Sequence, residues 1–258
     1  MKKIKFLRAG LVIGGITTVL LLDSKTISAQ EVDYSSNGLV EFTPNNNPTD
    51  PVNPNNPDPN KPVKPTDPIT KLPTKKGTSG PLSIDFASSL DFGKQEITSK
   101  EMTYYANPQT YGDSKDKTAN YIQVTDNRGS ATGWKLAVKQ NTQFQTTDNA
   151  KKELTGAKLT INNTVADSIA KTKINTPKTE TVITLIPTEA SLIMTASKGQ
   201  GMGTWVGRFG ALQTLKENDQ ENVKNIDVQL TVPGATEKSS ARYQTTLNWS
   251  LSDTPEGK

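Results

Sequence analysis

The fold is decided by the stretch Gly133-Trp134-Lys135-Leu136-Ala137-Val138-Lys139-Gln140, in which apolar and polar side chains alternate from the tryptophan onward. Successive side chains of a β-strand point to opposite faces, so Trp134, Leu136 and Val138 share one face. The same alternation appears in Tyr243-Gln244-Thr245-Thr246-Leu247-Asn248-Trp249-Ser250-Leu251. Each stretch therefore predicts a strand with an aromatic and an aliphatic side chain on one face.

Short alternating segments separated by Gly, Asn, Asp, Pro and Ser clusters fill the sequence from residue 81 onward. No segment has a sustained 3.6-residue periodicity, so helices are not expected. This pattern predicts an all-β domain, an antiparallel β-sandwich of the Ig-like or Greek-key type, over residues 81–258. The expected strands are residues 82–86, 89–92, 103–106, 121–126, 134–140, 159–162, 182–186, 192–196, 204–209, 226–232 and 242–250.

The first residues have the pattern of a secretory signal peptide. Basic residues at positions 2, 3, 5 and 8 precede the uncharged apolar run Ala9–Leu22, which is short for a membrane-spanning helix. Small residues at Thr26–Ala29 suit cleavage after Ala29. We therefore expect residues 1–29 to be removed, giving a secreted protein that does not insert into a membrane.

Charge and residue usage exclude several classes of function. The chain has a net charge of +4, but residues 1–29 carry five basic groups and one acid, so the remainder has no net charge. Nucleic-acid binding then lacks its electrostatic driving force. Cysteine and histidine are absent, which excludes disulfides, a Ser-His-Asp triad, a cysteine nucleophile and the usual zinc sites.

Proline is concentrated in one region, since eleven of the sixteen prolines lie between Pro44 and Pro81, among Asn, Asp, Thr and Lys. Proline donates no backbone hydrogen bond, and the polar neighbours offer little apolar surface to bury. Residues 43–80 are therefore predicted to be a disordered Pro/Asn/Asp-rich spacer. Residues 30–42, with the strand-like Gly38–Phe42, are expected to form a short N-terminal strand that could pair with the main sheet across the spacer.

The two tryptophan motifs allow two interpretations. A buried indole contributes a large apolar area and seeks one hydrogen-bond acceptor, so both tryptophans could be core residues. Alternatively, an exposed indole could stack on the apolar face of a sugar ring. We expect the two motifs to lie in one aromatic-lined region with Trp205 and Phe209. The candidate binding residues are Trp134, Leu136, Tyr243, Leu247, Trp249 and Leu251.

This combination of motifs resembles the WxL-domain surface proteins of low-GC Gram-positive bacteria. Their pattern pairs a Trp-x-Leu segment with a distal Tyr-x-x-Thr-Leu-x-Trp-x-Leu segment, and both are present here in that order. Gly80–Asp85, followed by Leu90–Gly93, is similar to the family's domain opening. The resemblance implies a secreted protein at the cell wall surface, attached noncovalently through peptidoglycan and often associated with other surface proteins.

Three classes of function remain open. The domain could bind peptidoglycan directly, it could be a subunit that mainly binds a partner surface protein, or it could be a glycan hydrolase that uses two carboxylates. No cofactor, metal or catalytic residue is expected. The glycine-rich Gly199–Gly203 lacks a following helix and a Lys-Ser/Thr pair, so it predicts a turn between strands and not a nucleotide loop.

Overall fold

The structure is a computed structural model that describes residues 31–112, 114–217 and 220–253. The chain divides into two units, Met1–Glu41 and Phe42–Lys258. The expected signal peptide, residues 1–29, lies outside the described residues. Residues 31–42 are exposed and contain no strand, so the strand expected at Gly38–Phe42 is not formed. None of the described strands pairs with this segment.

The described part of the second unit contains only strands and loops, which confirms the all-β class, and it contains no helix that could cross a membrane. The strands are β1 (Pro65–Thr66), β2 (Leu82–Ala87), β3 (Met102–Ala106), β4 (Gln109–Tyr111), β5 (Lys117–Thr118), β6 (Tyr121–Asp126), β7 (Trp134–Gln140), β8 (Gln145–Thr146) and β9 (Lys158–Asn162). They continue with β10 (Thr164–Asp167), β11 (Lys178–Thr179), β12 (Val182–Leu185), β13 (Ala190–Ala196), β14 (Gly203–Phe209), β15 (Leu212–Glu217), β16 (Gln220–Val232), β17 (Tyr243–Gln244) and β18 (Leu247–Ser252).

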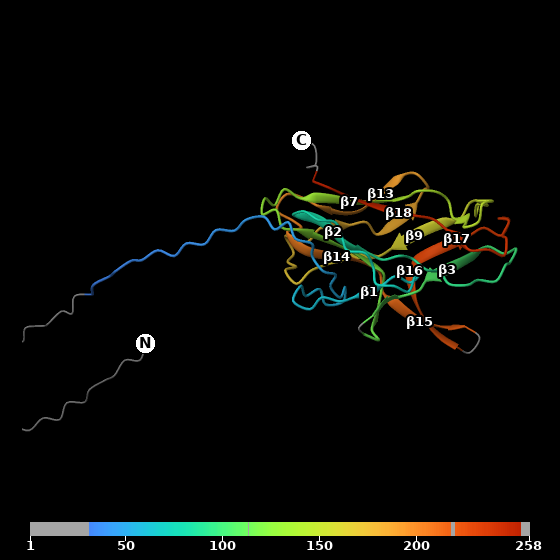
Figure 1. The fold of residues 1–258 in the computed structure, drawn as a ribbon, viewed down its shortest axis with the longest axis horizontal. Coiled ribbons are helices and arrows are strands. Elements are labelled where there is room, and N and C mark those ends of the chain that lie inside the picture. The colour runs from blue at the N-terminus through green and yellow to red at the C-terminus, as the bar shows by residue number, and fades with distance from the viewer. Residues whose placement is uncertain (1–30, 113, 218–219, 254–258) are drawn as a thin grey trace, which may run out of the picture. The chain divides into compact units, whose positions relative to one another are not determined.

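Hydrogen bonds join these strands into separate antiparallel sheets whose members come from distant parts of the chain. The larger sheets have the orders β10-β14-β6-β2, β11-β13-β7-β18 and β12-β9-β16-β15, with β3 also paired to β16. Two smaller sheets have the orders β1-β4-β5 and β17-β8. In Figure 1, β7, β13 and β18 lie together above the group formed by β9, β16 and β3.

The expected sandwich of two facing layers is not what the described residues form. Instead, the sheets are set around one core in a propeller-like way, although each combines strands from distant parts of the chain. Bulges bend a strand and interrupt its ladder. They occur at Ile84/Phe86 in β2, Leu192/Met194 in β13 and Asn225/Gln229 in β16. Because alternation does not reveal these interruptions, the sequence could not predict how the strands group.

One large hydrophobic core lies between the larger sheets. Its fully buried side chains include Trp134, Leu136, Ile161, Trp205 and Phe209. These residues come from β7, β9 and β14, strands of three different sheets, so the core depends on their assembly and not on a local motif. Burial of these apolar side chains is the main stabilising contribution to the fold.

Residues 43–80, which we call the strap, are not the disordered spacer that their composition predicts. Strand β1 pairs with β4, and isolated bridges join Val52 to Pro62 and Thr66 to Pro73. Val52 is completely buried in a second apolar cluster with Phe86, Tyr111, Tyr121 and Val206. The strap therefore covers the second face of the sheet that contains β2, β6 and β14.

Polar contacts that the composition does not reveal hold the strap in place. The Val52 N–H donates to Oε1 of buried Gln123 at 2.7 Å, and Gln123 Nε2 donates to the Asp50 carbonyl at 3.0 Å. A Cβ at Gly77 would lie 2.5 Å from the Asp85 backbone, so only glycine allows this close approach to β2. These contacts explain why a proline-rich segment is ordered, since side chains of the sheet satisfy its backbone groups.

A buried carboxyl group lies beneath the strap. Asp85 is 1% exposed and accepts hydrogen bonds from Ser83 Oγ at 2.6 Å, Thr125 Oγ1 at 2.6 Å and Gln123 Nε2 at 2.9 Å. Burial raises the pKa of Asp85 above its ordinary value, and the hydrogen bonds only partly offset this. The strap is therefore packed over a group whose ionisation is disfavoured in the folded protein.

Candidate functional site

The two tryptophan motifs, expected from the sequence to share one region, lie on neighbouring strands. Strand β18 pairs with β7 in antiparallel register, with Trp249 opposite Val138 and Leu251 opposite Leu136. The pairing joins segments that are far apart in the chain, so β18 is an integral part of the domain. The motifs therefore form one continuous structural unit at the edge of the β11-β13-β7-β18 sheet.

The first motif belongs to the core. Trp134 is 1% exposed and Leu136 is fully buried. The Trp134 indole N–H donates to the Gly201 carbonyl at 3.0 Å. Gly201 has a positive φ of 73°, and a Cβ there would lie 2.5 Å from Trp134 Nε1. The glycine-rich turn thus closes over this indole, which leaves Trp134 no face for stacking on a sugar.

The second motif is half-buried. Leu247, Trp249 and Leu251 pack against the core, and their neighbours in the strand point outward. The Trp249 ring stacks on Phe209 with centroids 6.1 Å apart and an interplanar angle of 8°. Trp205, also suggested as a neighbour, is fully buried and donates from Nε1 to the Met202 carbonyl at 2.9 Å.

Tyr243, the remaining candidate residue, lies on β17 and not on β18. It is half-buried, and its hydroxyl oxygen accepts from the Ser239 N–H at 2.8 Å. The structure therefore brings Trp134, Leu136, Leu247, Trp249 and Leu251 together, with Tyr243 at the start of the same chain segment. The contacts of all six are those of a packed framework and not of an exposed ligand platform.

Arg128, in the loop between β6 and β7, forms ion pairs close to the start of β7 and the end of β18. Arg128 forms two hydrogen bonds to Asp126, from Nε to Oδ1 at 2.9 Å and from Nη2 to Oδ2 at 2.8 Å, and also donates to the Gly133 carbonyl at 2.7 Å. Its Nη1 lies 3.9 Å from Asp253 Oδ2, just beyond β18. The hydrogen bonds to Asp126 raise the pKa of Arg128, so this guanidinium stays charged and committed to its partner.

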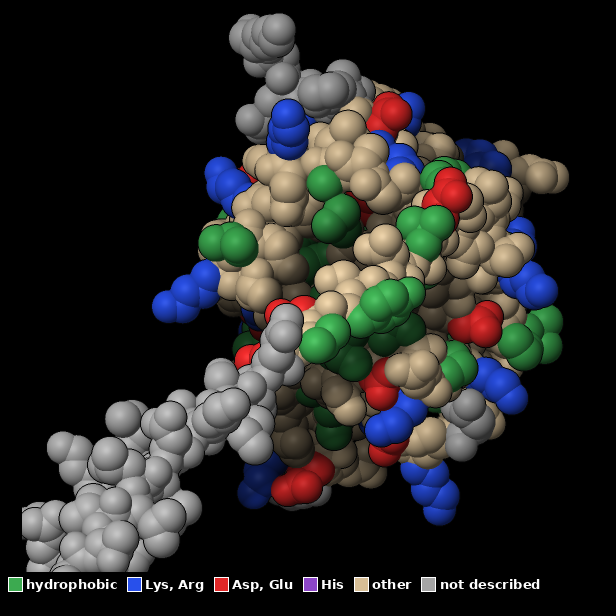
Figure 2. All heavy atoms as spheres, turned by 90° about the vertical axis from the view of Figure 1, so that its left-hand side faces the viewer, with side chains coloured by type: hydrophobic (Ala, Val, Ile, Leu, Met, Phe, Trp, Pro, Cys, Tyr) green, Lys and Arg blue, Asp and Glu red, His purple; other side chains and the backbone are tan. Residues whose placement is uncertain are grey.

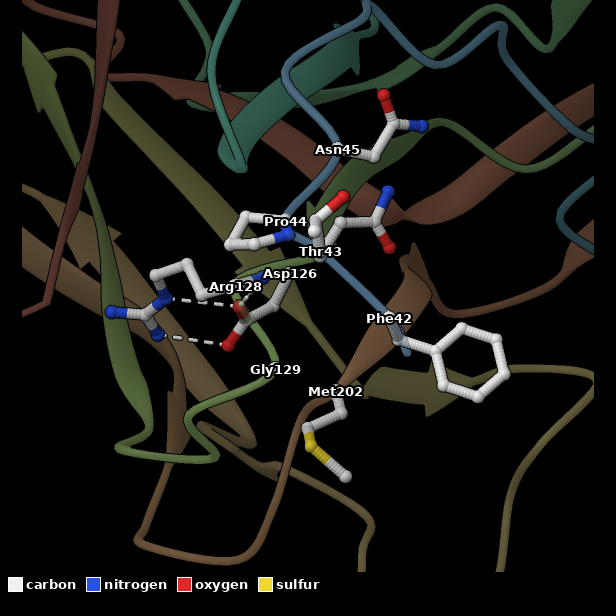
Figure 3. A pocket seen from close by; sticks show the side chains of 9 residues that line it. Phe42, Thr43, Pro44, Asn45, Asp126, Arg128, Gly129 and Met202 are labelled. Carbon is white, nitrogen blue, oxygen red and sulfur yellow. Dashed lines mark hydrogen bonds and ion pairs between the residues drawn. The ribbon is translucent and has the colours of Figure 1, made fainter. Parts of the chain in front are cut away.

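A hollow of about 450 Å³, which we call the Arg128 hollow, opens beside this ion pair. It is lined by Phe42, Thr43, Pro44, Asn45, Asp126, Asn127, Arg128, Gly129 and Met202. Figure 3 shows the guanidinium bound to the Asp126 carboxylate, with the Phe42 and Met202 side chains on another part of the rim. Phe42 is 88% and Met202 is 47% exposed, so the rim includes accessible apolar surface.

A second hollow of about 340 Å³, which we call the threonine hollow, lies where β18 begins. The terminal strand expected at residues 242–250 is broken, since Tyr243–Gln244 pairs with β8 and β18 starts only at Leu247. The break leaves residues 245–246 outside any strand, beside the loops that flank β8, where the Thr246 carbonyl accepts from the Asn141 N–H at 2.9 Å. All lining residues are polar: Thr142, Gln145, Thr146, Thr147, Lys151, Gln244, Thr245 and Thr246.

Hydrogen bonds fix the walls of the threonine hollow. Thr245 Oγ1 donates to the Thr142 carbonyl at 2.6 Å, and Thr146 Oγ1 donates to Asp148 at 2.6 Å. The bond from Thr146 holds the pKa of Asp148 below its ordinary value. Lys151 has a left-handed φ of 48° and an exposed side chain. It is the cation among the lining residues, while the nearby Asp148 is bound by Thr146 and the Ala150 N–H.

Sequence reasoning did not identify this second hollow. Its residues come from the chain around β8 and from the polar first half of the distal motif, Gln244-Thr245-Thr246. A signal was present, because three hydroxyl or amide side chains in succession interrupt the apolar alternation of that motif. Within the ranges that the structure describes, no group of three His, Cys, Asp or Glu residues could hold a metal ion.

The fold and the paired motifs define an all-β domain whose two Trp-x-Leu segments lie in the core and pack against it. The WxL domain surface cell wall-binding family matches residues 29–255, and the chain belongs to that family. The match includes the strap as well as the sheets. No curated protein and no solved structure matches the chain. Membership places the protein at the cell surface in association with the cell wall.

Proposed function

We propose that this is an exported protein of a low-GC Gram-positive bacterium that binds peptidoglycan directly and noncovalently through residues 42–253. The observation that carries the proposal is the match of a wall-binding family to residues 29–255, a range that contains the whole described body. Residues 1–29 would act as the cleaved signal peptide. The mature protein would carry no net charge to attract nucleic acid. On the face drawn in Figure 2, cationic and acidic side chains are likewise interspersed.

The proposal is for binding without catalysis. Glycoside hydrolysis usually requires two carboxylates on either side of the scissile bond. Asp126 is the one carboxylate that lines the Arg128 hollow, and it is held by Arg128. The threonine hollow is lined by hydroxyl, amide and ammonium groups. Neither hollow contains a pair of carboxylates that could act as acid and base, which favours a binding protein over a hydrolase.

A specific observation favours a second candidate function, binding of a partner surface protein. Exposed apolar side chains line the Arg128 hollow, namely Phe42 and Met202, and Ile174 is 84% exposed. Ile174 belongs to the loop that contacts the glycine-rich turn, since the Gly201 N–H donates to the Asn175 carbonyl at 3.0 Å. Exposed apolar side chains that lie close together are typical of protein–protein contacts.

Sedimentation with purified, protein-free peptidoglycan separates the two candidates. If the domain binds the wall directly, the mature protein should sediment with this material in a saturable way and without any other protein. A soluble protein of similar size that lacks wall affinity is the control. Sedimentation only after a second surface protein is added would replace direct binding by the partner-mediated function.

A further inference from the structure

We propose that the threonine hollow is the wall-contacting site, and that it binds the peptide stems of peptidoglycan, with their amides and free carboxylates, and not its sugar rings. This inference rests on the proposed direct binding to peptidoglycan. The peptide stem is then the part of the polymer that is recognised, and the tryptophans that define the motif do not contact it.

The lining of the threonine hollow has the chemistry to bind a peptide. Threonine hydroxyls and glutamine amides can each donate and accept hydrogen bonds, while the lysine ammonium only donates. A peptide stem presents alternating N–H donors and carbonyl acceptors, and its carboxylates only accept. Thr147 and Gln244 are exposed, and the described residues show no hydrogen bond from either side chain. Both groups are therefore available to a ligand in the hollow.

The threonine hollow offers no surface on which a sugar ring could stack. None of the lining residues of the threonine hollow is aromatic. Trp134 and Trp205 are 1% and 0% exposed, and Trp249 is half-buried with its ring against Phe209. Recognition of a hexosamine ring through its apolar face therefore has no aromatic partner at this site. Hydrogen bonding to an extended polar chain does not require one.

The threonine hollow also presents a positive charge that a carboxylate can reach. Lys151 is exposed and lines the hollow, whereas Arg128 in the other hollow is bound bidentately by Asp126. A carboxylate would have to compete with Asp126 for Arg128, but it can approach Lys151 directly. Asp148 and Glu153 lie near Lys151 and weaken its field, although they are bound by Thr146 and by Gln145. The charge of Lys151 should therefore make a modest contribution.

The experiment uses the mature protein and three probes. These are intact protein-free peptidoglycan, the same material after an amidase has removed the stems, and soluble stem peptides prepared without sugar. The proposal predicts binding to intact peptidoglycan, loss of binding to the stem-free glycan strands, and competition by the soluble peptides. Equal binding to intact and stem-free material would overturn the inference and leave direct wall binding in place.

Matched variants locate the site. Lys151→Gln should weaken binding roughly two- to fivefold, as expected for one exposed charge. Gln244→Glu should also weaken it, because the added carboxylate repels the carboxylate of a stem. Lys152→Gln is the control, since Lys152 does not line the hollow and its ammonium donates to Ser239 Oγ at 3.4 Å. All variants should melt like the parent protein.

Each remaining outcome is decisive. Unchanged affinity in both Lys151→Gln and Gln244→Glu would show that the ligand binds elsewhere and would overturn the assignment of the threonine hollow. Weaker binding of Gln244→Glu together with tighter binding of Gln244→Lys would support an anionic ligand at this position. Failure of the parent protein to bind any probe would instead contradict the proposed direct binding on which the inference rests.

Discussion

Truncation of the two motif tryptophans tests whether they are framework residues. We expect Trp134→Ala to destabilise the domain strongly, because the side chain is 1% exposed and its N–H donates to the Gly201 carbonyl. A buried indole removes about 150–250 Å² from water. At roughly 25 cal/mol per Å² this is about 4–6 kcal/mol, and measured truncations of buried aromatics cost about 3–5 kcal/mol.

Trp249→Ala should cost less. Trp249 is half-buried on an edge strand, although it stacks on Phe209. About half of the burial contribution would be lost, or roughly 2 kcal/mol. Domains of this kind are typically stable by about 5–15 kcal/mol. Trp134→Ala therefore comes close to unfolding the protein, whereas Trp249→Ala should leave a folded domain that can be tested for binding.

Urea unfolding followed by circular dichroism measures both losses, with wall binding assayed on the same samples. The conservative control Trp134→Phe keeps an aromatic side chain but leaves the Gly201 carbonyl without its donor, so about 1–3 kcal/mol should be lost. Binding should fall only in proportion to unfolding. A folded Trp134→Ala protein of normal stability that no longer binds the wall would refute the framework interpretation.

Three further changes test other parts of the structure. Val52→Asp would place a carboxylate in the apolar cluster under the strap, so the amide hydrogens of residues 43–80 should exchange faster than in the parent protein. Amide hydrogens of this segment that exchange without protection in the parent protein would contradict the ordered strap. Because burial raises the pKa of Asp85 above 3.8, the folded protein binds the Asp85 proton more tightly than the unfolded chain does. Protonated Asp85 therefore stabilises the folded state fully below about pH 3.8, and this stabilisation is lost as the pH rises through the raised pKa. Asp85→Asn should therefore flatten the fall in unfolding free energy over that window in urea titrations, and an unchanged slope would count against a raised pKa. Arg128→Leu leaves the buried Asp126 carboxylate without its ion-pair partner and should lower the unfolding free energy by about 3–5 kcal/mol. Asp253→Asn removes a partner that is 75% exposed and should lower it by under about 1 kcal/mol. Equal shifts in melting temperature would contradict this ranking.

Local alternation predicts individual strands well where the apolar side chains at every second position enter a core. Strands β6 and β7 have the bounds expected from the sequence, because their apolar side chains at every second position enter the main core. The expected strand at residues 89–92 is not formed, although Phe92 is buried. Burial of a single aromatic in a loop gives the same local pattern as a strand, so periodicity over so few residues cannot separate them.

The strap could not be predicted because its order depends on distant partners. Its prolines and polar residues offer little to bury among themselves, yet Val52 enters a cluster built by β2, β4, β6 and β14. A signal existed in β6, where the expected polar face contains Tyr121, Gln123 and Thr125 and no residue is exposed. A strand buried on both faces requires a second covering layer, and the strap supplies it.

The candidate site was predicted in part. Alternation and the spacing of the motifs indicated that Trp134 and Trp249 share one region, and the β7–β18 pairing places them on neighbouring strands. The threonine hollow was missed because it requires Lys151 and the β8 region to meet residues 244–246. No local pattern encodes that approach, which follows from the break between β17 and β18.

The most direct test of the account is amide hydrogen exchange of the mature protein with and without soluble peptidoglycan fragments. We expect added protection in residues 142–151 and 244–246, with unchanged exchange in the buried Trp134–Gln140 strand. Added protection confined to residues 126–129 and 199–203, around the Arg128 hollow, would contradict the assignment of wall binding to the threonine hollow.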